Sequence, residues 1–150
     1  MMMKNPEEVV REWMKIGAAR VIVHLEDLDV ERIEILSSEL RLETEVGLAL
    51  NLDTPIEKLE EHIHHFDFIH LMSIDERGAQ GRMFDEKIFD KLKELQAKHL
   101  EIPISIDGGV NLQNAEELIH LGADRLVVGS AIFGAENPEE ALEDFLEIAT

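Results

Sequence analysis

Short runs of β-branched and aliphatic residues alternate along the chain with longer stretches in which apolar residues recur every three or four positions. The short runs predict β-strands, and the longer stretches predict amphipathic helices. The predicted strands cover residues 20–26, 45–51, 66–74, 102–107 and 125–128. The predicted helices cover residues 6–16, 29–42, a segment that begins at residue 55, 84–99, 111–121 and a segment from 138 to the C-terminus.

Capping residues mark several of these predicted helix boundaries. Asn5, Thr54 and Asn137 each precede a proline, and this pairing is typical of a helix N-terminus. Gly17 and Gly122 follow the last apolar position of a predicted helix, where glycine commonly ends a helix.

The order of elements predicts the fold class. Strands that alternate with helices of this length lie parallel and are joined by right-handed crossovers. The strands are almost continuously apolar, which indicates a sheet covered on both faces. No proline-rich or glycine-rich linker divides residues 1–150, so we expect one α/β domain. Periodicity alone does not decide whether the sheet is open or curls into a barrel.

Composition and charge exclude several classes of partner. Hydrophobic residues make up 45% and charged residues 31% of the 150 residues, as in ordinary globular proteins. The formal net charge of -19 repels phosphate backbones, so nucleic acid is not expected as a partner. No apolar run is long enough to span a membrane, no signal peptide is recognisable and cysteine is absent, which together favour the cytoplasm.

Glycine-containing motifs end the last two predicted strands, and they carry a family resemblance. Residues 104–111, 122–124 and 127–133 resemble the "VDGGVN … AGAD … VAGSAIF" signature of ribulose-phosphate 3-epimerases. Earlier segments agree in the same order. Residues 23–26 are similar to the family's "VHxE", residues 47–55 to "GVALNPxTP", and residues 72–74 to "MTV".

The resemblance implies a ribulose-phosphate-binding barrel of the (β/α)8 type, in which about eight strands close on themselves. This sequence resembles that family from its fourth strand onward, and residues 2–6 resemble the segment directly after the third strand. We therefore expect parallel β/α units of an incomplete barrel with about five strands, completed by oligomerisation or by another chain.

The family resemblance also implies a chemistry for Asp107. The family inverts a carbon beside a carbonyl with two carboxylates, and a divalent metal held by two His and two Asp assists the reaction. Of these four ligands, only Asp107 is matched, as both the catalytic and the metal-binding residue. A single carboxylate cannot serve both faces of the carbon, so we expect the isolated chain to lack epimerase activity and its metal binding to be weak. Alternatively, Asp107 is an inherited turn residue before a glycine pair.

The family binds substrate phosphate through backbone N–H groups at positions that match Gly108, Gly109, Gly129 and Ser130. Glycine suits such a site because a Cβ would obstruct the approach of the backbone to phosphate. The alternative is a pair of tight turns without a ligand.

The loop after residue 74 departs from the family's "NPGFGGQKF". Gly78 and Gly81 can be aligned with it, but the Asn-Pro pair is lost and Arg82 replaces the Gln. Arg82 or Arg77 could pair with phosphate, although two acidic residues lie nearby in the sequence.

Four histidines suggest a metal site but do not support one from spacing. Of His62, His64, His65 and His70, only His62 and His65 would share a helix face, and no third ligand is evident. We interpret the helical histidines as surface residues. His24 and His70 lie on predicted strands and are interpreted as core or barrel-lining residues.

An incomplete barrel exposes two sheet edges and one face of its interior. We expect six strand residues to lose part of their cover: Val21, Val23, Leu48, Leu50, Ile104 and Ile106. A patch of this kind predicts self-association, or docking with a separate polypeptide that carries the missing strands.

Three functions remain open from the sequence. The first is a ribulose-phosphate 3-epimerase-like protein, truncated or diverged, which retains binding of a phosphorylated sugar or a phosphate ion. The second is a non-catalytic oligomeric scaffold or accessory subunit. The third is another phosphosugar lyase or synthase barrel, because related barrels share the phosphate site.

Overall fold

Five parallel strands form one sheet in chain order, in a computed structural model that describes residues 6–28, 40, 43–75, 82–98 and 101–149. The strands are β1 (Arg20–His24), β2 (Glu45–Leu50), β3 (Phe68–Met72), β4 (Ile104–Asp107) and β5 (Arg125–Val127). All five predicted strands are confirmed, each somewhat shorter than predicted. After β1, for example, Leu25–Asp27 turn into the short 3-10 helix η1.

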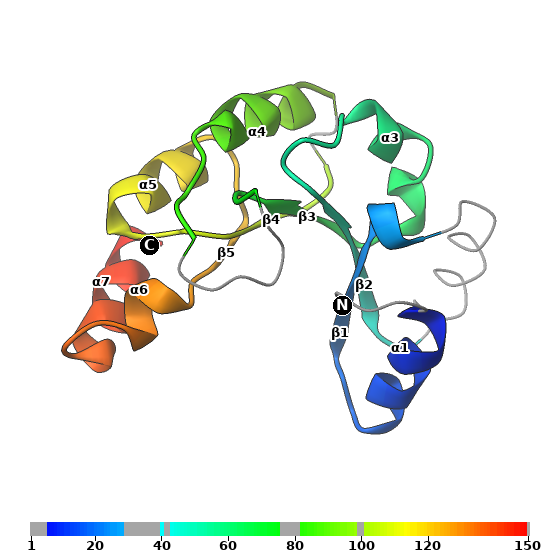
Figure 1. Cartoon of the computed structure of the whole chain (residues 1–150), viewed down its shortest axis with the longest axis horizontal. Coiled ribbons are helices and arrows are strands. Elements are labelled where there is room, and N and C mark those ends of the chain that lie inside the picture. Colours follow the sequence, from blue (N-terminus) through cyan, green and yellow to red (C-terminus); the bar gives the residue numbers. More distant parts are fainter. Residues whose placement is uncertain (1–5, 29–39, 41–42, 76–81, 99–100, 150) are drawn as a thin grey trace.

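The described helices follow one another around the outside of the sheet (Figure 1). They are α1 (Pro6–Lys15), α3 (Glu57–Glu60), the 3-10 helix η2 (Ile63–His65), α4 (Lys87–Lys98), α5 (Leu112–His120), α6 (Ser130–Phe133) and α7 (Pro138–Ile148). Among the described strands, β1 and β5 each pair with only one neighbour, so the sheet is open and not closed into a barrel.

Two of the predicted helix boundaries differ in the structure. The Thr54 hydroxyl donates to Glu26 Oε1 at 2.6 Å and caps no helix, and the predicted helix from residue 55 is divided into α3 and η2. Helix α4 begins at Lys87 instead of residue 84, because the Asp85 N–H donates to the Ser73 carbonyl and ties this segment to the end of β3.

Asn137 caps α7 as predicted, by accepting a hydrogen bond from the Glu140 N–H. The predicted cap at Asn5 and the predicted helix over residues 29–42, apart from the buried Leu40, lie outside the described residues.

Register divides the strand residues between two faces. One face, which packs against the helices, contains rows of aliphatic partners such as Leu48, Ile69 and Ile104, and Leu50, Leu71 and Ile106. The alternate residues lie on the other, inner face. One inner row runs through His24, Ala49, His70, Ser105 and Arg125.

The expectation that six apolar strand residues would lose their cover is wrong. Val21 is 5% exposed, and the other five (Val23, Leu48, Leu50, Ile104 and Ile106) are fully buried. Alternation along a strand explains the outcome, because all six point toward the helices and none toward the open interior.

The inner face is polar and aromatic near the N-terminal ends of the strands. The Phe68 ring lies where a side chain at Gly47 would lie, since an ideal Cβ on Gly47 would be 2.3 Å from the ring. The guanidinium carbons of Arg20 and Arg125 lie 5.4 and 5.0 Å from the ring centroid, within the range of cation–π contact. Glu45 lies 2.6 Å from Arg20 and 3.7 Å from Arg125.

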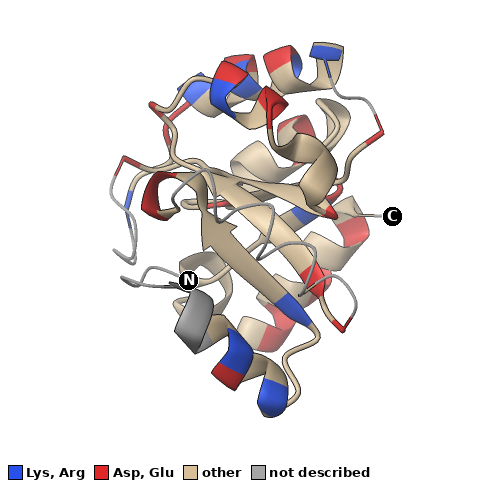
Figure 2. Cartoon of the chain, turned by 90° about the vertical axis from the view of Figure 1, so that its right-hand side faces the viewer, with Lys and Arg blue, Asp and Glu red and all other residues tan. Residues whose placement is uncertain are grey.

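Charged residues gather on helices and connecting loops, while the strands are almost free of them (Figure 2). In the part of the chain that the structure describes, no helix has the length and apolar character needed to cross a bilayer.

Candidate functional site

Asp107 is the last residue of β4, and its side chain lies on the inner face of the sheet with 35% of its area exposed. Its Oδ2 lies 3.3 Å from His70 Nε2. The other ring nitrogen, His70 Nδ1, lies 3.2 Å from Ser105 Oγ. The side chains of two adjacent strands thus form a short polar chain from Ser105 through His70 to Asp107.

The backbone around Asp107 is held from β3. The Ser73 N–H donates to the Asp107 carbonyl at 2.8 Å, and the Ser73 hydroxyl donates to the Gly108 carbonyl at 2.5 Å. Ser73 is fully buried, so these bonds are shielded from water. The carboxylate therefore projects from a fixed position at the end of its strand.

The fold itself requires glycine at positions 108 and 109. Gly108 has a φ of 123° and Gly109 a φ of 62°, which side chains disfavour. An ideal Cβ on Gly109 would also lie 2.6 Å from the Phe84 backbone nitrogen. A tight turn against the segment at Phe84 is thus sufficient to explain this glycine pair.

Gly129 differs from that pair. Its φ is -112°, which any residue adopts, and no other part of the chain lies within 4 Å of an ideal Cβ there. The residue leads directly into α6, whose first residue is Ser130. Neither backbone geometry nor packing requires glycine here, and the space beside it is open.

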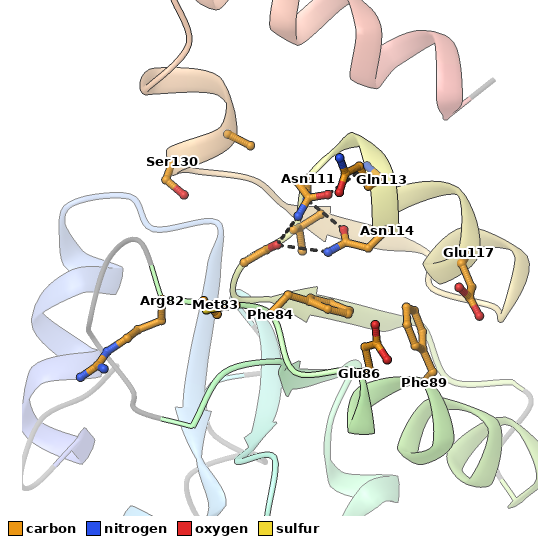
Figure 3. Close-up of a pocket in the computed structure, with 13 residues that line it drawn as sticks. Arg82, Met83, Phe84, Glu86, Phe89, Asn111, Gln113, Asn114, Glu117 and Ser130 are labelled. Carbon is orange, nitrogen blue, oxygen red and sulfur yellow. Dashed lines mark hydrogen bonds between the residues drawn. The ribbon is translucent and has the colours of Figure 1, made fainter.

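A cavity of about 560 Å³ lies at the carboxyl ends of β4 and β5 and contacts both glycine turns. Gly109 lines it from one turn and Ser130 from the other. The side-chain amides of Asn111 and Asn114 both donate to the Gly109 carbonyl, at 3.1 and 3.2 Å, and so fix this turn (Figure 3).

The far wall of the same cavity is aromatic and acidic. The rings of Phe84 and Phe89 lie 5.3 Å apart, and the carboxylates of Glu86 and Glu117 lie beside them. The sequence interpretation did not include these residues, because they belong to segments that meet the glycine turns only in the folded chain.

The loop residues of the predicted site are only partly placed. Gly78 and Gly81 lie outside the described residues. Arg82 lines the cavity, but its guanidinium extends away from Asn111 and Asn114 (Figure 3). Its geometry therefore adds no support for a contact with phosphate.

Two charged groups organise the loops after β1 and β2. Burial raises the pKa of Glu26, but hydrogen bonds from His24, Thr54 and the Asn51 N–H outweigh it and bring the pKa to about 2. The Lys91 ammonium donates to the carbonyls of Asn51, Leu52 and Thr54 at 2.5–2.7 Å. Burial lowers the pKa of Lys91 to about 8, against the raising effect of Glu26.

The histidines of residues 62–65 do not form a metal centre. The His64 and His65 rings lie 3.9 Å apart, in η2 and not on a regular α-helix face. Over the described ranges, no group of three or more His, Cys, Asp or Glu side chains could hold a metal ion. His70 and Asp107 supply one nitrogen and one oxygen donor, which suits a divalent metal in kind, but they are two ligands and not a full set.

The location of His70 beside Asp107 is the main feature that sequence reasoning missed. The prediction that His70 is a buried, barrel-lining residue agrees with its 4% exposure. Alternation in β3 and β4 was the available signal, because His70, Ser105 and Asp107 all fall on the face opposite the aliphatic rows.

Known proteins resemble this chain both in sequence and in fold. The sequence pattern of the Ribulose-phosphate 3 epimerase family matches residues 1–133. Ribulose-phosphate 3-epimerase of Aquifex aeolicus is 33% identical over 144 residues, covering 93% of this chain and 64% of the relative. The chloroplastic enzyme of Arabidopsis thaliana is 34% identical over 148 residues, covering 95% of this chain and 52% of the relative.

Two solved structures show the shared fold. The 3-hexulose-6-phosphate synthase of Salmonella typhimurium superposes with a TM-score of 0.80 at 19% identity, covering 98% of this chain and 69% of that one. KGPDC of Streptococcus mutans, in its complex with ribose-5-phosphate, superposes with a TM-score of 0.77 at 14% identity, covering 97% of this chain and 68% of that one.

The solved structures are TIM-barrel-like enzymes, and the open sheet corresponds to part of such a barrel. The chain spans less than two thirds of the length of its two sequence relatives. With a family match over residues 1–133, this chain belongs to the ribulose-phosphate 3-epimerase family.

Proposed function

We propose that this chain binds the phosphate of a phosphorylated sugar at the carboxyl ends of β4 and β5, as the phosphate-binding part of an epimerase-type barrel. One observation carries the proposal: Gly129 leaves open space that the fold does not need, beside Ser130 and at a cavity that reaches Gly109. Missing side-chain bulk allows backbone N–H groups to approach phosphate closely. Family membership makes a ketose phosphate the expected ligand.

The chemistry available to the described residues is limited to one face of a substrate. Asp107 is a partly exposed carboxylate on a rigid strand end, suited to remove or return a proton beside a carbonyl. Inversion of a carbon needs a second acid–base group on the opposite face. We therefore propose that this chain alone binds the sugar phosphate and that epimerisation needs groups beyond the described residues.

The test measures binding of ribulose 5-phosphate and of inorganic phosphate by calorimetry and by thermal shift. Gly129→Val fills the open space, and Ser130→Ala removes the hydroxyl. We expect Gly129→Val to weaken binding of both ligands at least about tenfold, with little change in the unfolding temperature of the free protein. Val127→Thr is the matched control, because this exposed residue lies just before the same connection and does not line the cavity.

Equal affinity of Gly129→Val and the unmodified chain would overturn the proposal, as would indifference of the unmodified chain to both ligands. Indifference would instead favour a non-catalytic scaffold or accessory role. One observation supports that second candidate: the apolar side chains of Val127, Phe133 and Leu142, on β5, α6 and α7, are 43%, 81% and 46% exposed. Light scattering at micromolar concentration distinguishes a defined oligomer from a monomer.

A further inference from the structure

We propose that His70 and Asp107 together bind one divalent metal ion on the inner face of the sheet. His70 is a ligand that the family resemblance did not supply, since it matched Asp107 alone. The inference deepens the proposed function and rests on it for the role of the ion toward a sugar phosphate. Metal binding itself is measured without any sugar or phosphate, so the two proposals can fail separately.

The distance between the two donor atoms favours a shared ion. His70 Nε2 and Asp107 Oδ2 are 3.3 Å apart. A charge-assisted N–H···O bond has a typical length of about 2.7–2.9 Å, so this contact is long for a His–carboxylate hydrogen bond. Metal–ligand bonds of about 2.0–2.2 Å at tetrahedral or octahedral angles place neighbouring donor atoms roughly 2.9–3.4 Å apart. The observed separation falls within that range.

Ser105 orients the imidazole in the way that metal-binding histidines are usually oriented. Its Oγ lies 3.2 Å from His70 Nδ1, on the ring side opposite Asp107. When Nδ1 carries the proton and donates it to Ser105, Nε2 presents a lone pair toward the carboxylate. A second partner on the other ring nitrogen commonly fixes a metal-ligating histidine, and its loss lowers metal affinity about 10- to 100-fold.

Both ligands project from rigid positions, and one of them is open to solvent. His70 is the central residue of β3 and is 4% exposed, whereas the Asp107 side chain is 35% exposed. The buried nitrogen and the accessible carboxylate leave one side for water or oxygen atoms of a substrate, which divalent ions readily accept. Two protein ligands predict modest affinity.

The nearest cationic side chain on the inner face does not occupy this position. Arg125 is the register partner of Ser105, but its guanidinium lies over the Phe68 ring and 3.7 Å from Glu45, toward the N-terminal ends of the strands. The chain as a whole carries a formal charge of -19, so its field attracts cations to the site.

The experiment titrates the complete, tag-free chain, first treated with a chelator, with Co²⁺, and follows visible absorption and thermal shift. We expect one saturable site. His70→Asn and Asp107→Asn should each weaken Co²⁺ binding at least about tenfold, and Ser105→Ala should weaken it less. His64→Asn and His120→Asn are matched controls, because both histidines are exposed and lie on other elements, and they should leave the affinity unchanged.

A measurement on the unmodified protein guards against variants that fail to fold. Bound Co²⁺ is paramagnetic, so it should broaden the ring signals of His70 in the NMR spectrum before those of His120. The proposal is overturned if the chain binds no Co²⁺, if His70→Asn and Asp107→Asn bind it as well as the controls do, or if His120 broadens first. Metal binding without phosphate binding would refute the proposed function and leave this inference standing.

Discussion

The two faces of the sheet are built from alternate residues of the same strands, yet they differ in chemistry. The face toward the helices is aliphatic, and its central residues Leu48, Leu50, Ile69, Leu71, Ile104 and Ile106 are fully buried. The inner face has ionic, aromatic and hydrogen-bonding side chains: Arg20, Glu45, Phe68, His70, Ser105, Asp107 and Arg125.

This difference shows where the stability of the described chain originates. Closed (β/α)8 barrels fill their interior with layers of mostly branched apolar side chains. The inner side of this sheet instead satisfies its polar groups locally, as Ser105, His70 and Asp107 do. An open sheet with such an inner side does not place a large apolar surface in water. The aliphatic face and its helices therefore supply most of the hydrophobic stabilisation.

Removing bulk from the aliphatic face should have the largest effect. Leu71→Ala leaves a cavity between β3 and the helices, and we expect a loss of about 3 kcal/mol in the free energy of unfolding, as for other buried leucines. Ser105→Ala, on the inner face of the neighbouring strand, should cost about 1 kcal/mol, since it removes one hydrogen bond. Urea denaturation measures both. Equal losses would contradict the contrast between the faces.

A buried charge within the helical layer should come next. Lys91→Met leaves the carbonyls of Asn51, Leu52 and Thr54 without their donor, and we expect a loss of about 2–3 kcal/mol despite the added apolar surface. Lys93→Met on the same helix is the control, because the Lys93 side chain is 55% exposed and pairs only at 3.7 Å with Asp90. Its unfolding midpoint should hardly change.

The one tightly packed place on the inner face gives a third effect. Gly47→Ala would place a Cβ 2.3 Å from the Phe68 ring, and we expect this overpacking to cost about 1–2 kcal/mol. Phe68→Leu shortens the side chain that lies against Gly47. The double variant should therefore lose less than the sum of the single losses. Strict additivity in denaturation experiments would show that the ring and the glycine do not press on each other.

The sequence predicted the elements well because the signals for them are local. Five aliphatic runs gave five strands in the right order, and Asn137 capped α7 as its position before a proline suggested. Thr54 carried the same signal but forms no cap, because Glu26, distant in sequence, accepts its hydroxyl hydrogen bond. A contact of that kind depends on the fold and has no local signature.

The same reasoning explains the errors about the open interior. The sequence identified Val23 and Leu48 as strand residues, but which face they occupy relative to the helices follows from register, and the helix-facing side won. The glycine turns were correctly read as strand ends. The distinction between Gly109, which the turn requires, and Gly129, which has open space beside it, needed coordinates.

A change at the boundary between the two faces should give the smallest effect, and pH isolates it. The pKa of Glu26 is about 2 in the folded chain, against an ordinary value of 4.5. Between these values the unfolded chain binds more protons than the folded one, so the stabilisation is complete above pH 4.5 and is lost as the pH falls toward 2. We expect about 1 kcal/mol from this group, because the carboxylate is partly exposed. Glu26→Gln should therefore be less stable than the unmodified chain at about pH 7, and the difference should shrink in denaturation experiments below about pH 4. Glu61→Gln, at an exposed position beyond α3, should follow the unmodified chain throughout, and a Glu26→Gln curve that also runs parallel to it would mean that Glu26 does not anchor the loop after β2.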